Sequence, residues 1–492
     1  MTLVSAQQVL VLSNRSPYSV TEEHGRLNLA PGIGGLAAAL APLASARGVR
    51  WVSAANSDAE RKAATERSCD DTLHFLEIDE ETYHRYYDDI ANSTLWFVHH
   101  GMYDRVAGRA FDVEWHQAWD CYRAVNKLFA RAAARSAPAG AVVLVQDYHL
   151  ALVGALLRRD RPDLAICHFS HTPFASPTDL EVLPMAVARE LLEAMSHYDL
   201  CGFHCATWEE AFRSSSMRFI GECPKTLVAP LGPDGASLAS RVESSACRAY
   251  GEALETLAAG RKLIVRVDRL EPAKNHLRGF QAFDELLHSE PRWREQVVFL
   301  ALANPSRQAS AEYATYRREV ERMVAEINAR WATPGWTPIV LTIGDNADRS
   351  LAALGRYDVL LVNPIRDGLN LVAKEGPLLN YRDGVLVLSK NAGAWECMSN
   401  GALTVNPFDV FESRLALARA LDMSRRERVA RAAMARHGAG LFDWSSWLAE
   451  HYRALGVVGE PHRSSGDGEE TGAGPLPVSS PELESAGARQ GR

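Results

Sequence analysis

Short apolar runs alternate with longer amphipathic segments along most of this chain. In the first half the runs are VLVLS (residues 9–13), VRWVSA (49–54), AVVLVQ (141–146), AICHFS (165–170) and LCGFH (200–204). In the second half they are KLIVRVD (262–268), QVVFLALA (296–303), PIVLTIG (338–344), DVLLVNP (358–364) and GVLVLS (384–389). Helical periodicity fills the gaps, for example over residues 114–134. This alternation predicts parallel sheets covered by helices.

The stretch APLGPDGASLAS (residues 229–240) interrupts the rhythm and is typical of a connection between domains. We therefore predict an α/β chain of two doubly wound, Rossmann-like domains, residues 1–233 and 234–457, which face each other across a central cleft. A last helix over residues 444–455 is expected to pack back on the first domain. Residues 458–492 are rich in Gly, Ser, Pro and acids, so we expect a disordered tail.

Composition excludes several classes of protein. Of the 492 residues, 47% are hydrophobic and 23% charged, as in ordinary soluble proteins, and the net charge of −8 argues against general nucleic-acid binding. No apolar stretch reaches the roughly 20 residues that span a bilayer, and the N-terminus lacks the basic start of a secretion signal. We expect a cytoplasmic protein without nucleic-acid or membrane partners.

The eight cysteines are scattered without paired spacing, so we expect reduced thiols. CGFHC (residues 201–205) and CHFSH (167–171) lie in strand-like runs and lack a second group of ligands. We therefore expect no metal site.

The stretch NPIRDGLNLVAKE (residues 363–375) places polar residues where a buried strand leads into a helix. Free backbone N–H groups and the positive end of the helix favour an anion there, and Gly368 permits close backbone approach or a positive φ. Asp367 and Glu375 can accept hydrogen bonds from sugar hydroxyls. The alternative is structural: Asp367 caps the helix and Glu375 is a solvated helix residue.

A second basic site follows another strand. In RLEPAKNHLRGF, Arg269 and Lys274 flank a turn that contains a proline at the start of a helix. Two permanent positive charges at such a turn suit a diphosphate, because both side chains provide charge-assisted donors. Taken alone, the pair could equally belong to a solvated helix.

The first half adds weaker signals. SNR (residues 13–15) follows the first strand, and APGIGGLAAAL (30–40) is a glycine turn of a type that can hold phosphate. The aromatic residues of YYDDIANSTLW (86–96) can stack on a sugar ring or belong to the core. QDYHL (146–150) and SHTPF (170–174) each place a histidine just beyond a strand, where a purely structural role is also open.

Order and spacing of these motifs resemble glycosyltransferase family 20, the family of the trehalose-6-phosphate synthases, from about Val9 to Leu455. The motifs in family order are SNR, GGL, YY…LW, DYHL, HTPF, DRLEPAKN, NPSR, RDGLNLVAKE, NAGA and VNPFD. The resemblance implies a GT-B fold and a retaining, metal-independent transfer of glucose from UDP-glucose or GDP-glucose to glucose 6-phosphate, giving α,α-trehalose 6-phosphate. It implies small-molecule substrates, no cofactor besides the nucleotide sugar, and leaves a homo-oligomer open.

Carried over position by position, the resemblance assigns roles. The residues implied in catalysis are Arg269, Lys274, His171 and Asp367, of which Arg269 and Lys274 would hold the donor diphosphate. The further donor-binding residues would be Gly35, Asp147, Gly368, Asn370, Leu371, Val372 and Glu375, with Glu375 on the ribose and Asp147 and His171 on the transferred sugar. The acceptor-binding residues would be Arg15, Tyr87, Trp96 and Arg307. Retaining enzymes of this family are thought to use no protein nucleophile, so the site would act by positioning and charge stabilisation.

The chain departs from the family pattern at three places. Gln146 stands where the family usually has histidine, Ala54 stands where a second tryptophan would follow Trp51, and LEPAKN replaces the commoner LDYSKG. These changes resemble the validoxylamine 7′-phosphate synthase branch, but the retained RDGLNLVAKE loop favours a conventional sugar donor. The alternatives are another phosphorylated acceptor, either an aminocyclitol phosphate or a glycerol phosphate, and a non-catalytic sensor of sugar phosphate.

Overall fold

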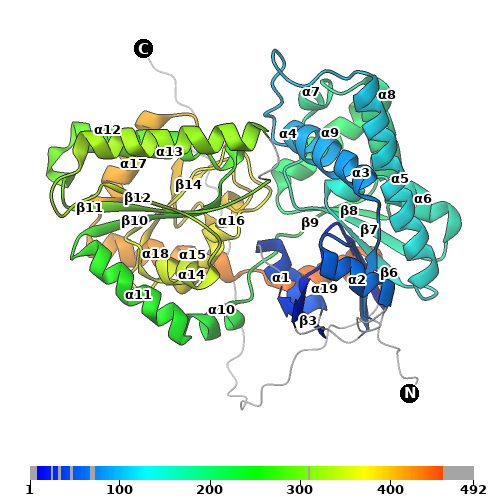
Figure 1. The fold of residues 1–492 in the computed structure, drawn as a ribbon, viewed down its shortest axis with the longest axis horizontal. Coiled ribbons are helices and arrows are strands. Elements are labelled where there is room, and N and C mark those ends of the chain that lie inside the picture. Colours follow the sequence, from blue (N-terminus) through cyan, green and yellow to red (C-terminus); the bar gives the residue numbers. More distant parts are fainter. Residues whose placement is uncertain are drawn as a thin grey trace, which may run out of the picture. The chain divides into compact units, whose positions relative to one another are not determined.

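A computed structural model of the chain describes residues 8–23, 26–31, 35–44, 48–66, 72–307 and 311–457. The first half forms a seven-stranded sheet in the order β5-β4-β1-β6-β7-β8-β9, and every neighbouring pair is parallel (Figure 1). Its strands are β1 (Val9–Ser13), β4 (Val49–Ala54), β5 (Leu73–Leu76), β6 (Val142–Gln146), β7 (Ala165–Ser170), β8 (Leu200–Phe203) and β9 (Thr226–Val228).

The second half forms a six-stranded parallel sheet in the order β12-β11-β10-β13-β14-β15. Its strands are β10 (Lys262–Arg269), β11 (Val297–Asn304), β12 (Ile339–Ile343), β13 (Val359–Val362), β14 (Val385–Ser389) and β15 (Leu403–Val405). In both sheets the strand order reverses beside the first strand, as in doubly wound folds that bind ligands beyond the carboxyl ends of the strands.

Helices cover both faces of each sheet (Figure 1). In the first half they are α1 (Gly35–Ala44), α2 (Asp58–Glu66), α3 (Glu80–His84), the π-helix η1 (Arg85–Leu95), α4 (Trp96–His99), α5 (Val113–Ser136), η2 (Tyr148–Leu150), α6 (Val153–Asp160), α7 (Pro177–Leu180), α8 (Met185–Ser196) and α9 (Ala206–Phe219). In the second half they are α10 (Gly235–Val242), α11 (Ser245–Ala258), η3 (Pro272–Lys274), α12 (His276–Ser289), η4 (Pro291–Trp293), α13 (Ala311–Trp331), α14 (Ala347–Arg356), α15 (Val372–Leu379), α16 (Trp395–Met398), α17 (Val410–Asp422), α18 (Arg425–Gly440) and α19 (Trp444–Leu455).

Strand β1 shows why continuous apolar runs form this architecture. All of its residues are buried, because successive side chains point to opposite faces and both faces are covered by helices. Val9 and Val11 belong to one core that includes Trp447 of α19, and Leu10 and Leu12 belong to another that includes the residues of α5. The runs predicted as strands from the sequence are confirmed as strands.

Several elements were not predicted. A two-stranded antiparallel hairpin, β2 (Tyr18–Glu23) with β3 (Arg26–Pro31), follows β1, and the short strands β5, β9 and β15 extend the sheets at their edges. The stretch expected to connect the two domains contains helix α10 from residue 235 onward, and its role as a connection stays a prediction. Asp234 starts this helix because its carboxylate accepts hydrogen bonds from the N–H groups of Ala236 and Ser237.

The last helix, α19, packs on the first sheet. Its Trp447 ring lies edge-on to Phe169 of β7 at 5.1 Å between centroids. Its His451 lies close to Gly202 of β8, where an added Cβ would be 3.3 Å from His451 Nε2. The domain boundary between residues 233 and 234 stays a prediction. The predicted disordered tail, residues 458–492, lies outside the described residues, as do residues 32–34 of the glycine turn.

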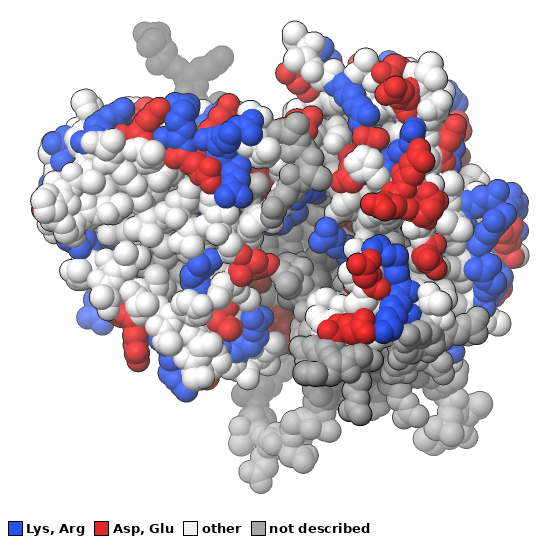
Figure 2. Space-filling view, viewed as in Figure 1, with Lys and Arg blue, Asp and Glu red and all other residues white. Residues whose placement is uncertain are grey.

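Three expectations concern membrane-spanning helices, surface charge and cysteines. No helix within the described ranges combines the length and apolarity required to cross a bilayer. Basic and acidic side chains lie interspersed on the face shown in Figure 2, rather than in one continuous band of a single sign. The seven cysteines in the described part of the chain are all free thiols.

Candidate active site

The loop between β13 and α15, residues 363–371, brings together the polar groups noted in its sequence. We call it the donor loop, after the nucleotide-sugar donor that it is predicted to bind. The Asp367 carboxylate accepts hydrogen bonds from Lys274 Nζ and from Asn370 Nδ2, the latter at 3.0 Å. Burial alone would raise the pKa of Asp367, but the charge and hydrogen bond of Lys274 hold it below its usual value. Leu371 is the N-cap residue of α15, so Asp367 does not cap this helix.

The backbone of the donor loop presents unpaired donors. Within the described residues, the N–H groups of residues 368–372 have no hydrogen-bond acceptor. Asn370 adopts the left-handed conformation at φ +75°, an arrangement that turns neighbouring N–H groups toward a common point. Unpaired N–H groups next to the start of a helix are of the kind that favours an anion.

Gly368 is required by close packing of backbones. A Cβ at this position would lie 1.8 Å from the carbonyl oxygen of His171, which belongs to the segment after β7. A Cβ at Gly393 would in turn lie 1.9 Å from the carbonyl oxygen of Gly368. Of the two expected uses of Gly368, close approach is the one observed, and the positive φ falls on Asn370 instead.

Glu271 joins two arginines, Arg269 at the end of β10 and Arg307 beyond β11. Its buried carboxylate contacts Arg269 Nη2 at 3.1 Å and Arg307 Nη1 at 3.0 Å. Burial by itself would raise the pKa of Glu271, but the two guanidinium charges hold it below its usual value. The sequence analysis did not single out this residue, although an acid between two basic residues in DRLEPAK was a visible signal.

Arg307 reaches residues of the first half of the chain. Its Nε donates to Asn92 Oδ1 at 2.8 Å, and its guanidinium lies 4.8 Å from the centre of the Trp96 ring. Its Nη1 also donates to the hydroxyl of Tyr313 at 2.6 Å. Trp96 is 1% exposed, so its ring packs against the buried side of the Arg307 guanidinium.

Arg15 and Tyr87 form the exposed part of the same region. Arg15 Nη2 donates to the Tyr87 hydroxyl at 3.0 Å, and Tyr87 acts electrostatically on both Arg15 and Arg307. The Tyr87 ring stacks on Tyr83 at 5.4 Å between centroids. The four residues predicted to bind the acceptor phosphate, Arg15, Tyr87, Trp96 and Arg307, therefore lie together.

Tyr83 is a residue that the sequence analysis missed. Ala54, which stands where the family has tryptophan, is fully buried and carries no ring. The Tyr83 hydroxyl donates to Asn56 Oδ1 and accepts from Asn14 Nδ2 at 3.1 Å, so its ring is fixed beside Tyr87. No motif marks this role, because it depends on the stacking of two tyrosines at i and i+4 on the same helical segment.

A chain of hydrogen bonds fixes the protons on His171 and His204. The N–H of Leu231 donates to Nδ1 of His204 at 3.2 Å, so the proton of neutral His204 resides on Nε2. That N–H donates to Nδ1 of His171 at 3.2 Å, and Nε2 of His171 then donates to Gln146 Oε1 at 2.7 Å. Burial lowers the pKa of His204 to about 3 and that of His171 well below its ordinary value, so both rings are neutral.

Asp147 lies beside these histidines in a strained backbone conformation, at φ +67°. Its Oδ1 accepts from the N–H of His171 at 3.2 Å and from Thr172 Oγ1 at 3.2 Å. Burial raises its pKa to about 6, against the lowering effect of these hydrogen bonds. Asp147 and His171 therefore lie together, with both ring nitrogens of His171 already engaged, and their contact with the transferred sugar stays a prediction.

Glu375 lies one turn into α15 and is partly buried. Burial raises its pKa to about 7, and Arg241 lowers it slightly. Because folding favours the protonated form, its contribution to stability is present at low pH and is lost as the pH rises through about 7. Within the described residues it makes no hydrogen bond or ion pair with Arg269 or Lys274. Gly35 begins α1, and its predicted approach to the donor stays a prediction.

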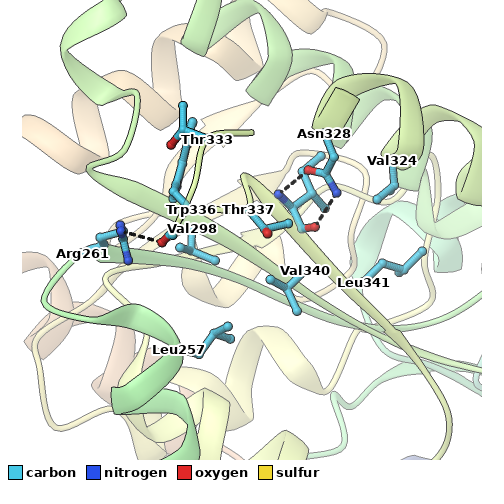
Figure 3. Close-up of a pocket in the computed structure, with 12 residues that line it drawn as sticks. Leu257, Arg261, Val298, Val324, Asn328, Thr333, Trp336, Thr337, Val340 and Leu341 are labelled. Atoms are coloured by element: carbon cyan, nitrogen blue, oxygen red, sulfur yellow. Dashed lines mark hydrogen bonds between the residues drawn. The ribbon is translucent and has the colours of Figure 1, made fainter. Parts of the chain in front are cut away.

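A hollow of about 540 Å³ lies elsewhere in the second half, next to the start of β12 (Figure 3). Its lining includes Leu257, Val298, Trp336 and Val340, and Asn328 hydrogen-bonds both backbone groups of Ile339 at its edge. The amino end of a parallel strand lies opposite the carboxyl ends that carry the site. We therefore interpret this hollow as a packing gap, separate from the site.

Among the described residues, no three His, Cys, Asp or Glu side chains lie together as a group that could hold a metal ion.

The shared position of Glu271 leads to a prediction about stability. Glu271→Ala should lower the free energy of unfolding by about 2–4 kcal/mol, because Arg307 would keep a buried charge without its carboxylate. Glu271→Gln, which retains one acceptor oxygen, should lose less. Unfolding in urea measures both. As a control, Glu427→Ala removes a half-exposed carboxylate that pairs with Arg419 and Arg431 and should leave the midpoint nearly unchanged. An equal loss in the control would contradict the role of Glu271.

Comparison with known proteins places this geometry in a family. Residues 7–456 match the model of glycosyltransferase family 20. The chain is 31% identical over 449 residues to the UDP-forming alpha,alpha-trehalose-phosphate synthase of Schizosaccharomyces pombe, covering 87% of this chain and 86% of that protein. It is also 31% identical over 499 residues to the trehalose-6-phosphate synthase of Mycolicibacterium smegmatis, covering 96% and 97%.

A solved structure supports the same assignment. The UDP-forming alpha,alpha-trehalose-phosphate synthase of Burkholderia xenovorans, in complex with glucose-6-phosphate, superposes with a TM-score of 0.79 at 28% identity and covers 91% of this chain and 100% of that one. The predicted GT-B fold of two Rossmann-like sheets is thereby confirmed. The chain belongs to glycosyltransferase family 20.

Proposed function

We propose that this chain is a retaining glycosyltransferase that moves glucose from UDP-glucose to glucose 6-phosphate and forms α,α-trehalose 6-phosphate. The observation that carries the proposal is a pair of neighbouring anion subsites joined by Glu271. One combines the free N–H groups of the donor loop with Lys274 and Arg269, and the other combines Arg307 with Arg15. The UDP-forming S. pombe enzyme and the glucose-6-phosphate complex from B. xenovorans support this pair of substrates.

The donor subsite would hold the nucleotide sugar. Arg269 is half exposed and retains donors beyond the one that contacts Glu271, so it can meet a diphosphate oxygen. Lys274 would do the same from the other side of its turn, with Asp367 holding its ammonium in place. Asp367 and the N–H groups of Gly368, Asn370, Leu371 and Val372 would contact glucose and phosphate, and Glu375 the ribose.

The acceptor subsite would hold the phosphate of glucose 6-phosphate between Arg15 and Arg307. Arg15 is exposed, and within the described residues its guanidinium hydrogen-bonds only the Tyr87 hydroxyl, so most of its donors remain for a phosphate. Tyr87 offers its ring to the sugar, and Trp96 fixes the guanidinium of Arg307 from the buried side.

In the proposed reaction the acceptor hydroxyl attacks the anomeric carbon on the face that the diphosphate leaves. The bond between that carbon and the diphosphate oxygen breaks, a glycosidic C–O bond forms, and the departing phosphate oxygen takes the hydroxyl proton. Lys274, Arg269 and the loop N–H groups stabilise the charge that develops on the diphosphate. His171 acts by shape and position, because its neutral ring has both nitrogens engaged by Gln146 and His204.

A second candidate changes the acceptor to another phosphorylated polyol, such as an aminocyclitol phosphate. The observation in its favour is the buried Ala54, where the family has a tryptophan near the acceptor, together with Tyr83 fixed beside Tyr87. The two candidates share the donor subsite and differ only in the sugar that is carried into the acceptor subsite.

Incubation with UDP-, GDP- and ADP-glucose in the presence of glucose 6-phosphate tests the proposal. We expect a disaccharide phosphate and release of UDP, followed by mass spectrometry and NMR of the product. Release of nucleotide only with an aminocyclitol phosphate or a glycerol phosphate would support the second candidate. Binding of sugar phosphate without turnover of any donor would indicate a sensor instead.

The two arginines that share Glu271 should separate in kinetics. Arg307→Ala should raise the KM for glucose 6-phosphate by at least about tenfold while the KM for UDP-glucose changes by less than about threefold. Arg269→Ala should instead cost about 2–4 kcal/mol of transition-state stabilisation, because its partner is the leaving diphosphate. Initial rates with each substrate varied in turn measure this difference. Equal effects of Arg307→Ala on both KM values would exclude its role on the acceptor.

Glu375 should make donor binding depend on pH. Its raised pKa of about 7 means that the carboxylate is protonated at lower pH and is a weaker acceptor for ribose hydroxyls. The KM for UDP-glucose should therefore rise as the pH falls from about 8 to about 6, with glucose 6-phosphate kept saturating because its own phosphate titrates near pH 6. Glu375→Gln should remove the pH dependence, and an unchanged slope in that variant would contradict the assignment.

A further inference from the structure

Helix α9 of the first sheet begins directly against the donor loop of the second. The indole N–H of Trp208 donates to the carbonyl oxygen of Asp367 at 3.0 Å and to that of Gly368 at 3.2 Å. Trp208 is 6% exposed, so this shared hydrogen bond is shielded from water. A side chain from the first half of the chain thus binds two consecutive peptide groups of a loop in the second half.

A carboxylate from the second half of the chain binds the start of α9. Glu396 of α16 accepts from the N–H of Ala206 at 2.9 Å and from the N–H and the hydroxyl of Thr207 at 3.1 and 3.0 Å. Cys205, the N-cap residue of α9, makes no side-chain cap. The start of α9 is therefore capped by a carboxylate from another element, which also suits the positive end of the helix.

The orientation of these peptide groups has a consequence for the anion subsite. In a trans peptide the C=O and the following N–H point in opposite directions. Because Trp208 holds the carbonyl oxygens of Asp367 and Gly368, the N–H groups of Gly368 and Leu369 are turned away from it. Both belong to the unpaired N–H groups of the donor loop.

We propose that Trp208 and Glu396 form a reciprocal clasp that sets the direction of the donor loop's N–H groups and thereby positions the nucleotide sugar. Neither side chain needs to touch the substrate, so both are positioning residues. The inference rests on the proposed function for the identity of the ligand. It goes further by assigning donor affinity to two residues outside the predicted site.

The clasp acts on one subsite only. Without the indole N–H, the Asp367 carbonyl keeps a hydrogen bond from Gly393 N–H at 3.1 Å, but the Gly368 carbonyl loses its only hydrogen-bond donor within the described residues. The peptide between Gly368 and Leu369 then loses the hydrogen bond that fixes its direction, while its neighbours stay bound through the N–H groups of Gly393 and Ala394. Arg15, Tyr87 and Arg307 are not part of the clasp, so acceptor binding should not change.

Trp208→Phe tests the clasp, because it removes the N–H and keeps most of the ring. We expect the KM for UDP-glucose and the Kd for UDP to rise about tenfold, equivalent to the loss of one hydrogen bond, with the KM for glucose 6-phosphate unchanged within about twofold. The matched control is Trp331→Phe in α13, which removes an indole N–H bound to Asp284 Oδ1, a residue outside the donor loop, and should change neither constant.

Hydrogen exchange and a second variant keep the test decisive. Amide exchange in residues 363–372 should accelerate in Trp208→Phe and not in Trp331→Phe. Glu396→Gln, a change at an exposed residue, should weaken UDP binding in the same direction and serves alone if Trp208→Phe does not fold. UDP binding and exchange rates unchanged in both clasp variants, or equal rises in both KM values, would overturn the clasp. An inactive wild type that still binds UDP would refute the proposed reaction and leave the clasp to these binding measurements.

Discussion

The site depends on the contact between the backbone of Gly368 and the carbonyl oxygen of His171. Only glycine allows this approach, since a Cβ at position 368 would overlap that oxygen. The contact brings the segment after β7 against the loop after β13, so residues from the carboxyl ends of both sheets share one region. Gly393 makes a second close backbone contact, with the carbonyl oxygen of Gly368. Trp208 adds a hydrogen bond to the same carbonyl group.

The basic side chains around this contact outnumber the carboxylates that pair with them. Glu271 neutralises part of the charge of both Arg269 and Arg307, and Asp367 does the same for Lys274. The cluster keeps an excess of positive charge and unpaired N–H groups, and both are unfavourable unless an anion or water is present. We interpret that excess as the driving force for binding two phosphorylated substrates side by side.

The histidines behind the site contribute order rather than proton transfer. Leu231, His204, His171 and Gln146 form a chain in which each proton has one possible position. Gln146, which replaces the usual histidine of the family, ends that chain with an oxygen that can only accept. The His171 ring is thereby held in one tautomer beside Asp147, whose carboxylate receives the backbone N–H of the same residue.

The sequence by itself determined the two sheets, their principal strands and the residues that follow them, because apolar runs with both faces buried leave little choice of structure. It also determined the donor loop and the basic turn, since Gly368, Asp367 and Lys274 lie at strand ends where parallel sheets bind ligands. Only the tertiary structure decided the partners of those residues. Three of these contacts are Glu271 between two arginines, Tyr83 beside Tyr87, and Trp208 on the donor loop. They depend on helix geometry or on segments far apart in the chain. Neither hydrophobic periodicity nor residue spacing shows which distant groups will meet.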